Sequence, residues 1–201
     1  LGARPVAVVG LGAGEIACHG RVDSEWTYYE IDPVVEQVAR NPSYFTYLRD
    51  CPPKVSVVLG DARLTIRNTL EERYGLIIID AFNSDAIPTH LLTKEAIADY
   101  FRKLAPDGIL ALHISNRHLN LAPVVGNLAK AAGLTGRLKN GEGNEKEYLL
   151  ATPATLAVLA RKDGDLGVIA ADTTWTTLSS NHSRVWSDDY INILGAMKVF
   201  Q

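Results

Sequence analysis

Short apolar segments recur along the first half of the chain and alternate with segments of helical spacing. The apolar segments predict strands, and the continuous runs among them are typical of strands buried on both faces of a sheet. They lie at residues 5–9, 26–30, 55–59, 76–79 and 109–114. Apolar residues spaced by three or four positions predict helices. These lie at residues 15–22, 33–40, 62–73, 93–104 and 122–132.

This alternation predicts an α/β fold with a mostly parallel, Rossmann-like sheet and helices on both faces. Residues 134–138 and 155–160 favour a closing antiparallel pair, and residues 190–199 a terminal helix. We expect one domain over residues 1–201, because a chain of this length can bury a core of its own. The chain starts at Leu1 and enters a strand almost at once, so we expect it to be a piece of a longer protein.

Composition excludes several classes of function. With 47% hydrophobic and 21% charged residues the chain is typical of globular proteins. Its net charge is -3 and it has no basic stripe, which argues against a nucleic-acid partner. No apolar run is long enough for a membrane helix, and we expect a cytoplasmic protein. Cys18 and Cys51 form no CxxC pair, and no histidines stand at metal spacing, so we expect two inert thiols and no metal.

Candidate ligand groups follow the predicted strands, and ligands of parallel sheets bind beyond the carboxyl ends of the strands. Gly10, Gly12 and Gly14 follow the first strand in a GxGxG pattern, where glycine permits a sharp turn and close approach of a ligand. Glu15 then occupies the place where a pyrophosphate would meet the helix. The loop therefore favours a neutral or cationic nucleoside over a dinucleotide, with a tight turn that binds nothing as the alternative.

Acidic residues follow the next two strands. Glu30 ends the second strand and is placed to accept both ribose hydroxyls, whereas Asp32 before Pro33 suits a helix cap. Asp61 and Ala62 follow the third strand, where an aspartate can accept from the amino group of adenine. A helix cap is the alternative for Asp61.

Two further acidic sites could receive a cation. Asp80 closes the most apolar strand, so its carboxylate stands at the end of a strongly apolar part of the sheet, where an ammonium or sulfonium would stabilise it. The alternative for Asp80 is a loop aspartate whose hydrogen bonds are satisfied within the protein. Asp188 and Asp189 lie between Trp186 and Tyr190, an aromatic and acidic mixture that suits a cationic ligand. The alternative for this pair is the start of a helix.

In this order, the segments VVGLGAGE, YYEIDP, GDAR and IIIDAF resemble the core of the spermidine synthase family, over roughly residues 5–133. The segments IPTHLLT and VWSDDY resemble the branch of that family that is often fused to membrane helices. The resemblance implies a seven-stranded methyltransferase-like sheet with an antiparallel last strand. It also implies transfer of an aminopropyl group from decarboxylated S-adenosylmethionine to a polyamine such as putrescine, without a metal.

The resemblance also assigns roles to individual residues. Asp80 would be the catalytic residue that orients the amine and helps to remove its proton. The three glycines, Glu30, Asp61 and Ala62 would bind the nucleoside. Asn83, Asp85, Asp188 and Asp189 would bind the amine substrate. The family has an aspartate where this chain has Ala13, and a second loop aspartate where it has Asn83.

Two other functions stay open at this point. One is an S-adenosylmethionine-dependent methyltransferase, which would share the nucleoside site. The other is a non-catalytic, nucleoside-binding regulatory domain. The sequence leaves open a homodimer, and attachment to a membrane domain in the full-length protein.

Overall fold

The computed structural model describes residues 4–81, 88–141 and 154–198. These residues form two compact units, which we describe separately. The first unit comprises residues 4–81 and 99–110, and the second unit the remaining described residues. Helix α4 (Lys94–Lys103) and strand β5 (Leu104–His113) each contribute residues to both units.

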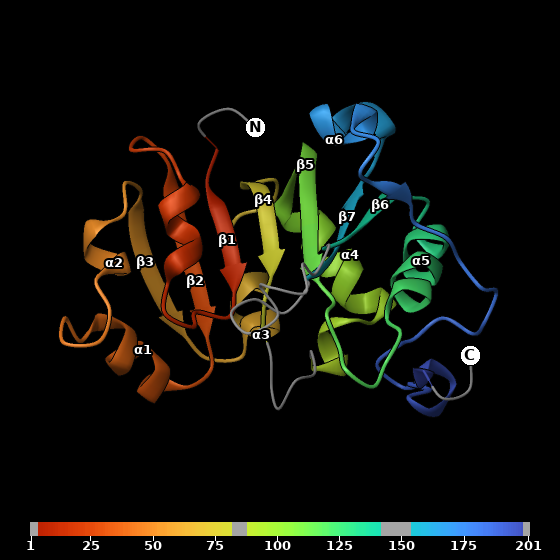
Figure 1. Cartoon of the computed structure of the whole chain (residues 1–201), viewed down its shortest axis with the longest axis horizontal. Helices are drawn as coiled ribbons and strands as arrows, with labels where there is room; N and C mark the ends of the chain where they lie inside the picture. Colours follow the sequence, from red (N-terminus) through yellow and green to blue (C-terminus); the bar gives the residue numbers. More distant parts are fainter. Residues whose placement is uncertain (1–3, 82–87, 142–153, 199–201) are drawn as a thin grey trace, which may run out of the picture. The chain divides into compact units, whose positions relative to one another are not determined.

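A parallel sheet forms the centre of the first unit (Figure 1). Its strands are β1 (Val6–Val9), β2 (Glu25–Glu30), β3 (Lys54–Leu59) and β4 (Tyr74–Ile79). β1 pairs in parallel with β2 on one side and with β4 on the other, and β2 pairs with β3. Every residue of β1 is buried, as its apolar run predicts, whereas β3 lies at the edge and is largely exposed.

The register of these strands aligns their carboxyl ends. Val9 of β1 pairs with Tyr29 of β2 and with Ile79 of β4. The residue that follows each of these three is therefore at the same level of the sheet. Paired residues of parallel strands point to the same face, so the side chains of Glu30 and Asp80 start from one face and one edge.

Four helical elements surround this sheet. They are η1 (Glu15–His19), α1 (Pro33–Arg40), α2 (Tyr47–Asp50) and α3 (Ala62–Arg67). The side chain of Asp32 accepts a hydrogen bond from the Val34 N–H at 2.8 Å and caps α1, as predicted. η1 and α3 are shorter than predicted. The chain leaves α3 at Asn68 and turns through Glu72, whose φ of 52° is incompatible with a continuing helix.

The second unit carries the antiparallel part of the sheet. β6 (Thr135–Asn140) pairs antiparallel with β7 (Thr155–Ala160) and with the two-residue β8 (Thr176–Thr177). Thr93 caps α4 by accepting from the Ala96 N–H at 3.2 Å, as predicted. The remaining elements of this unit are η2 (Thr89–Leu91), α5 (Ala122–Ala131), η3 (Asp163–Leu166), α6 (Val168–Ala171) and η4 (Leu194–Ala196).

The predicted fold class is confirmed: the strand order is β3-β2-β1-β4-β5-β7-β6-β8, mostly parallel, with antiparallel pairing among the C-terminal strands. The sheet has eight strands instead of seven, because of the short β8.

The prediction of a terminal helix over residues 190–199 is wrong. A single turn, η4, stands there, and the Asn192 side chain accepts from the Gly195 N–H at 2.9 Å instead of allowing a longer helix.

The prediction of two inert thiols is also wrong. Cys18 lies in η1 and Cys51 directly follows α2, and the structure joins them in a disulfide across 33 residues. Their Cα atoms are 4.6 Å apart, within the range that a disulfide requires. Sequence spacing could not reveal this pair, because it depends on the packing of η1 against α2.

A buried ion-pair cluster joins α3 to α4 within the first unit. The side chain of Asp99 is 5% exposed and accepts hydrogen bonds from Arg63 and Arg102 and from Arg67 at 2.7 Å. Burial would raise the pKa of the Asp99 carboxyl, but the hydrogen bonds from the three arginines outweigh burial and hold the pKa below its ordinary value.

We therefore predict that Asp99→Asn lowers the free energy of unfolding at neutral pH by about 3 kcal/mol, because it leaves guanidinium charges without their carboxylate. Since the folded pKa is depressed, the contribution is present above the ordinary aspartate pKa of about 3.9 and is lost as the pH falls through the lower folded pKa. Urea unfolding at a series of pH values should show the two stabilities converging in acid.

Asp107→Asn is the matched control. Asp107 also pairs with an arginine, Arg4, but both side chains are exposed. Exposed pairs contribute little, so this variant should unfold like the wild type. An Asp99→Asn protein that unfolds like the Asp107→Asn control at neutral pH would contradict the structural role of the cluster.

Candidate active site

The glycine loop leaves β1 at the aligned edge of the first unit. Gly10 has a φ of 96°, and a Cβ there would lie 2.5 Å from the carbonyl oxygen of Asp80. Only glycine allows the chains after β1 and β4 to approach this closely. At Gly14 (φ 85°) a Cβ would meet the Leu48 side chain of α2 at 2.5 Å, whereas Gly12 faces open space. The loop thus has one face packed on protein and one open.

Glu30 ties this loop to the neighbouring strand. Its side chain is buried, with the residue 8% exposed. One carboxylate oxygen accepts from the Leu11 N–H and the other from the Asp32 N–H, both at 2.9 Å. The carboxylate is therefore fixed between the glycine loop and the start of α1. A carboxylate has about four acceptor positions, so two backbone bonds leave acceptor capacity for hydroxyl groups of a ligand.

Asp61 and Ala62 stand at the start of α3. Asp61 caps the helix by accepting from the Leu64 N–H at 3.0 Å, which confirms the cap interpretation of the sequence. Ala62 is the first helical residue and is half-buried. Because Glu30 pairs with Leu59 at the end of β3, Asp61 follows the same edge of the sheet. The adenine-binding role of both residues stays a prediction.

Asp80 follows β4 at that edge and is half-buried. Its N–H donates to the Val9 carbonyl at 2.8 Å, which continues the β1–β4 pairing one residue beyond the strand. This bond fixes the backbone of Asp80 beside Gly10. The structure therefore brings together the glycine loop, Glu30, Asp61 and Asp80 within one unit.

Sequence analysis missed one member of this group, Tyr28. Its side chain is fully buried, and its hydroxyl accepts from the Ala17 N–H at 3.0 Å and donates to the Gly14 carbonyl at 3.2 Å. Burial and the nearby charge of Asp80 raise the pKa of Tyr28 to about 12, although the bond from Ala17 opposes them. The signal was present, because side chains two residues apart on a strand share a face, and Tyr28 precedes Glu30 by two.

None of the four predicted amine-binding residues is among the described residues of the first unit. Asn83 and Asp85 lie outside the described residues. Asp188 lies in the second unit, where its carboxylate accepts from the Thr93 hydroxyl at 2.7 Å and its N–H donates to Glu95 at 3.0 Å. Asp188 and Asp189 form a tight turn and do not start a helix. The neighbouring Tyr190 ring already stacks on Arg184, at 3.9 Å.

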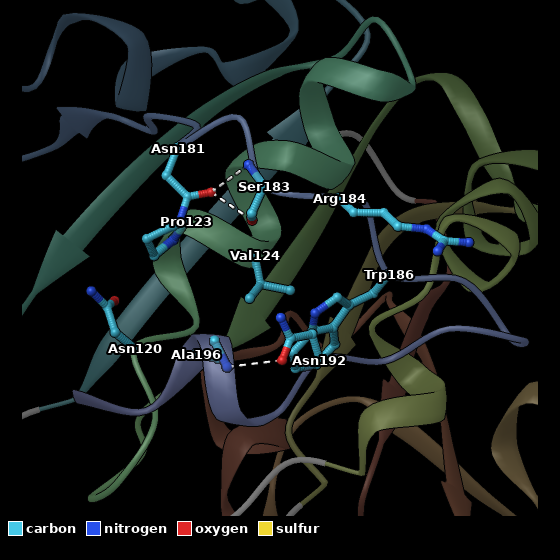
Figure 2. A pocket seen from close by; sticks show the side chains of 10 residues that line it. Asn120, Pro123, Val124, Asn181, Ser183, Arg184, Trp186, Asn192 and Ala196 are labelled. Carbon is cyan, nitrogen blue, oxygen red and sulfur yellow. Dashed lines mark hydrogen bonds between the residues drawn. The ribbon is translucent and has the colours of Figure 1, made fainter. Parts of the chain in front are cut away.

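The second unit contains a small cavity between the start of α5 and the C-terminal segment (Figure 2). Amide side chains from Asn120, Asn181 and Asn192 line it, together with Trp186. Figure 2 shows Asn181 accepting hydrogen bonds from Ser183 beside it. The cavity has a volume of about 30 Å³. This volume has room for water molecules but is far below the several hundred Å³ of a typical ligand pocket. It is not a nucleoside site.

No family model matches the chain. The chain does match a curated relative, the polyamine aminopropyltransferase of Vibrio vulnificus (strain CMCP6). The two are 33% identical over 110 residues, which cover 52% of this chain and 36% of the relative. The chain resembles the spermidine synthases. The motifs that predicted this resemblance lie in the part of the chain that carries the glycine loop, Glu30, Asp61 and Asp80.

Solved structures support the same fold. A probable spermidine synthase from Corynebacterium glutamicum ATCC 13032 has a TM-score of 0.61 at 15% identity, over 94% of this chain and 73% of that one. A spermidine synthase in complex with the transition state analogue AdoDATO has a TM-score of 0.59 at 17% identity, over 79% of this chain and 55% of that one. At these identities the likeness concerns the fold alone, and the match spans about a third of the curated relative's length.

Two features are absent from the described residues. No group of three or more His, Cys, Asp or Glu side chains there is arranged to hold a metal ion. Within the same ranges, none of the helices is both long enough and apolar enough to span a membrane.

We predict that Gly10→Ala lowers the free energy of unfolding by about 2–4 kcal/mol, because the methyl group would meet the Asp80 backbone and the φ is unfavourable for alanine. Gly12→Ala is the matched control. It also has a positive φ but meets no atoms within 4 Å, so the expected loss is about 1 kcal/mol. Thermal or urea unfolding measures both, and equal losses would contradict the close approach of the two backbones.

Proposed function

We propose that this chain is the nucleoside-binding part of an aminopropyltransferase that uses decarboxylated S-adenosylmethionine and a polyamine acceptor such as putrescine. The observation that carries the proposal is the position of Glu30. Its carboxylate is held by two backbone N–H groups beside the glycine loop, and Asp80 starts from the same face and edge of the sheet. Glu30 can bind a sugar and Asp80 a cation, so the pair suits a ligand that contains both a ribose and a positively charged group.

The nucleoside would bind across the open side of the glycine loop. Glu30 would accept hydrogen bonds from the ribose hydroxyls with its remaining acceptor capacity. Asp61 and Ala62 would face the adenine ring from the start of α3. Gly12, which has open space above it, would allow the ligand to approach the backbone.

Asp80 would act on the amine. The nitrogen of the acceptor amine attacks the aminopropyl carbon that is bonded to sulfur. The C–N bond forms as the C–S bond breaks, and the electron pair remains on sulfur to give methylthioadenosine. Asp80 orients the amine and takes the proton that the nitrogen loses. Placing the amine in line supplies much of the rate, and general-base help adds about 10²–10⁴-fold.

We predict that Asp80→Asn lowers turnover by at least about 100-fold, while methylthioadenosine binds within a few-fold of the wild type. The amide keeps the shape of the side chain but cannot take the proton. Steady-state kinetics with decarboxylated S-adenosylmethionine and putrescine measure turnover, and calorimetry measures binding. Full activity of Asp80→Asn would exclude Asp80 as the catalytic residue.

Asp32→Asn is the matched control for this experiment. Asp32 stands at the same edge but caps α1, and asparagine is an equally good cap. Its kinetics should therefore match the wild type. A similar loss in both variants would point to a general loss of negative charge and not to a specific base.

The amine end separates the proposed reaction from its alternatives. Calorimetry with decarboxylated and ordinary S-adenosylmethionine should show tighter binding of the decarboxylated form. Binding of the carboxylated form alone would favour methyl transfer, and nucleoside binding without turnover would favour a regulatory domain. Our proposed contacts for the amine remain Asn83, Asp85, Asp188 and Asp189.

Three further points also remain proposals: a homodimer, attachment to a membrane domain in the full-length protein, and a cytoplasmic location.

A further inference from the structure

The turn that ends the glycine loop is short and depends on its neighbours. η1 is a five-residue 3₁₀-helix, a type of helix with poor hydrogen-bond geometry of its own. It begins directly after Gly14, and no side chain caps its start. Its conformation, and that of the end of the glycine loop, must therefore be set by contacts from outside the turn.

Three such contacts are present. The Tyr28 hydroxyl accepts a hydrogen bond from the Ala17 N–H and donates one to the Gly14 carbonyl. The Leu48 side chain of α2 lies directly against Gly14. The Cys18–Cys51 disulfide is the third, and it joins η1 covalently to the end of α2. α2 is itself a single turn without a side-chain cap, so the disulfide connects two elements that are each weak alone.

The disulfide is open to chemistry. Cys18 is exposed, whereas Cys51 is half-buried and packs against the hydrophobic core cluster of this unit. An exposed disulfide can be attacked by a thiolate from solution. Reduction by a dithiol transfers two electrons and two protons, gives two thiols on the protein and converts the dithiol to its own disulfide.

We propose that Cys18 and Cys51 form a redox-modifiable site that sets the order of the glycine loop and, through it, the affinity for the nucleoside. The second part rests on the proposed function. In the disulfide form, η1 and α2 are fixed to each other and the loop is preorganised. In the dithiol form the turn keeps its contacts with Tyr28 and Leu48 but loses its covalent link to α2, so binding must order it further. Preorganisation of a binding loop raises affinity by lowering this ordering cost.

The first measurement is direct. Alkylation followed by mass spectrometry should find neither cysteine alkylated in the air-oxidised protein and both alkylated after treatment with dithiothreitol. Hydrogen exchange should then show faster exchange of the Ala17 N–H in the reduced protein, while amides of β1 keep their rates. Two labelled cysteines in the oxidised protein, or an unchanged Ala17 rate, would overturn the proposal without reference to any ligand.

The second measurement uses methylthioadenosine as the probe. Calorimetry should show at least about threefold weaker binding to the reduced protein. The Cys18→Ser/Cys51→Ser variant should bind like the reduced protein and no longer respond to dithiothreitol. Tyr28→Phe, which keeps the disulfide and loses only the hydroxyl, should bind more weakly yet still respond. Equal affinities of oxidised and reduced wild-type protein would overturn the link to binding.

A failure of the proposed function gives a different result. If methylthioadenosine binds to neither form while exchange at Ala17 still depends on the disulfide, the nucleoside assignment is wrong and the control of loop order stands. If it binds equally to both forms, the nucleoside assignment stands and the inferred link between the disulfide and binding is wrong.

Discussion

The carboxylate of Glu30 is the constraint on which the candidate site depends. A buried charge is costly unless hydrogen bonds compensate for it, and Glu30 obtains them from the backbones of Leu11 and Asp32. Hydrogen bonds to a charged group contribute about 1.5–3 kcal/mol each. The same two bonds therefore stabilise the carboxylate, draw the glycine loop onto β2 and fix the turn that leads into α1.

Sheet register extends this local arrangement to the other strands. Because β1 pairs in parallel with both β2 and β4, the residues after these strands stand at one level. The missing side chain of Gly10 then allows the backbone of Asp80 to approach β1. A one-residue slip of β4 would move Asp80 to the other face of the sheet. The position of the proposed base thus depends on the packing of Ile77 and Ile79 in the core.

Local signals in the sequence predicted what local physics decides. Apolar runs predicted the central strands, and Asp32 and Thr93 were recognisable as caps because a cap needs only a suitable side chain two or three residues before its partner N–H. What depends on distant packing was missed. The Cys18–Cys51 disulfide requires η1 and α2 to meet across 33 residues, and the backbone bonds of Glu30 require the glycine loop to fold back onto β2.

The buried environment of Tyr28 gives its hydroxyl a structural role, although the side chain shares one face of the sheet with two acidic residues. Its hydroxyl lies on the same face as Glu30 and Asp80, so it could in principle take a proton from a bound amine. With a pKa raised to about 12 it stays protonated at neutral pH, and its hydrogen already serves the Gly14 carbonyl. Glu30 already accepts a backbone N–H on each oxygen. Tyr28 and Glu30 thus hold the glycine loop through its backbone, and Asp80 remains the base that we propose.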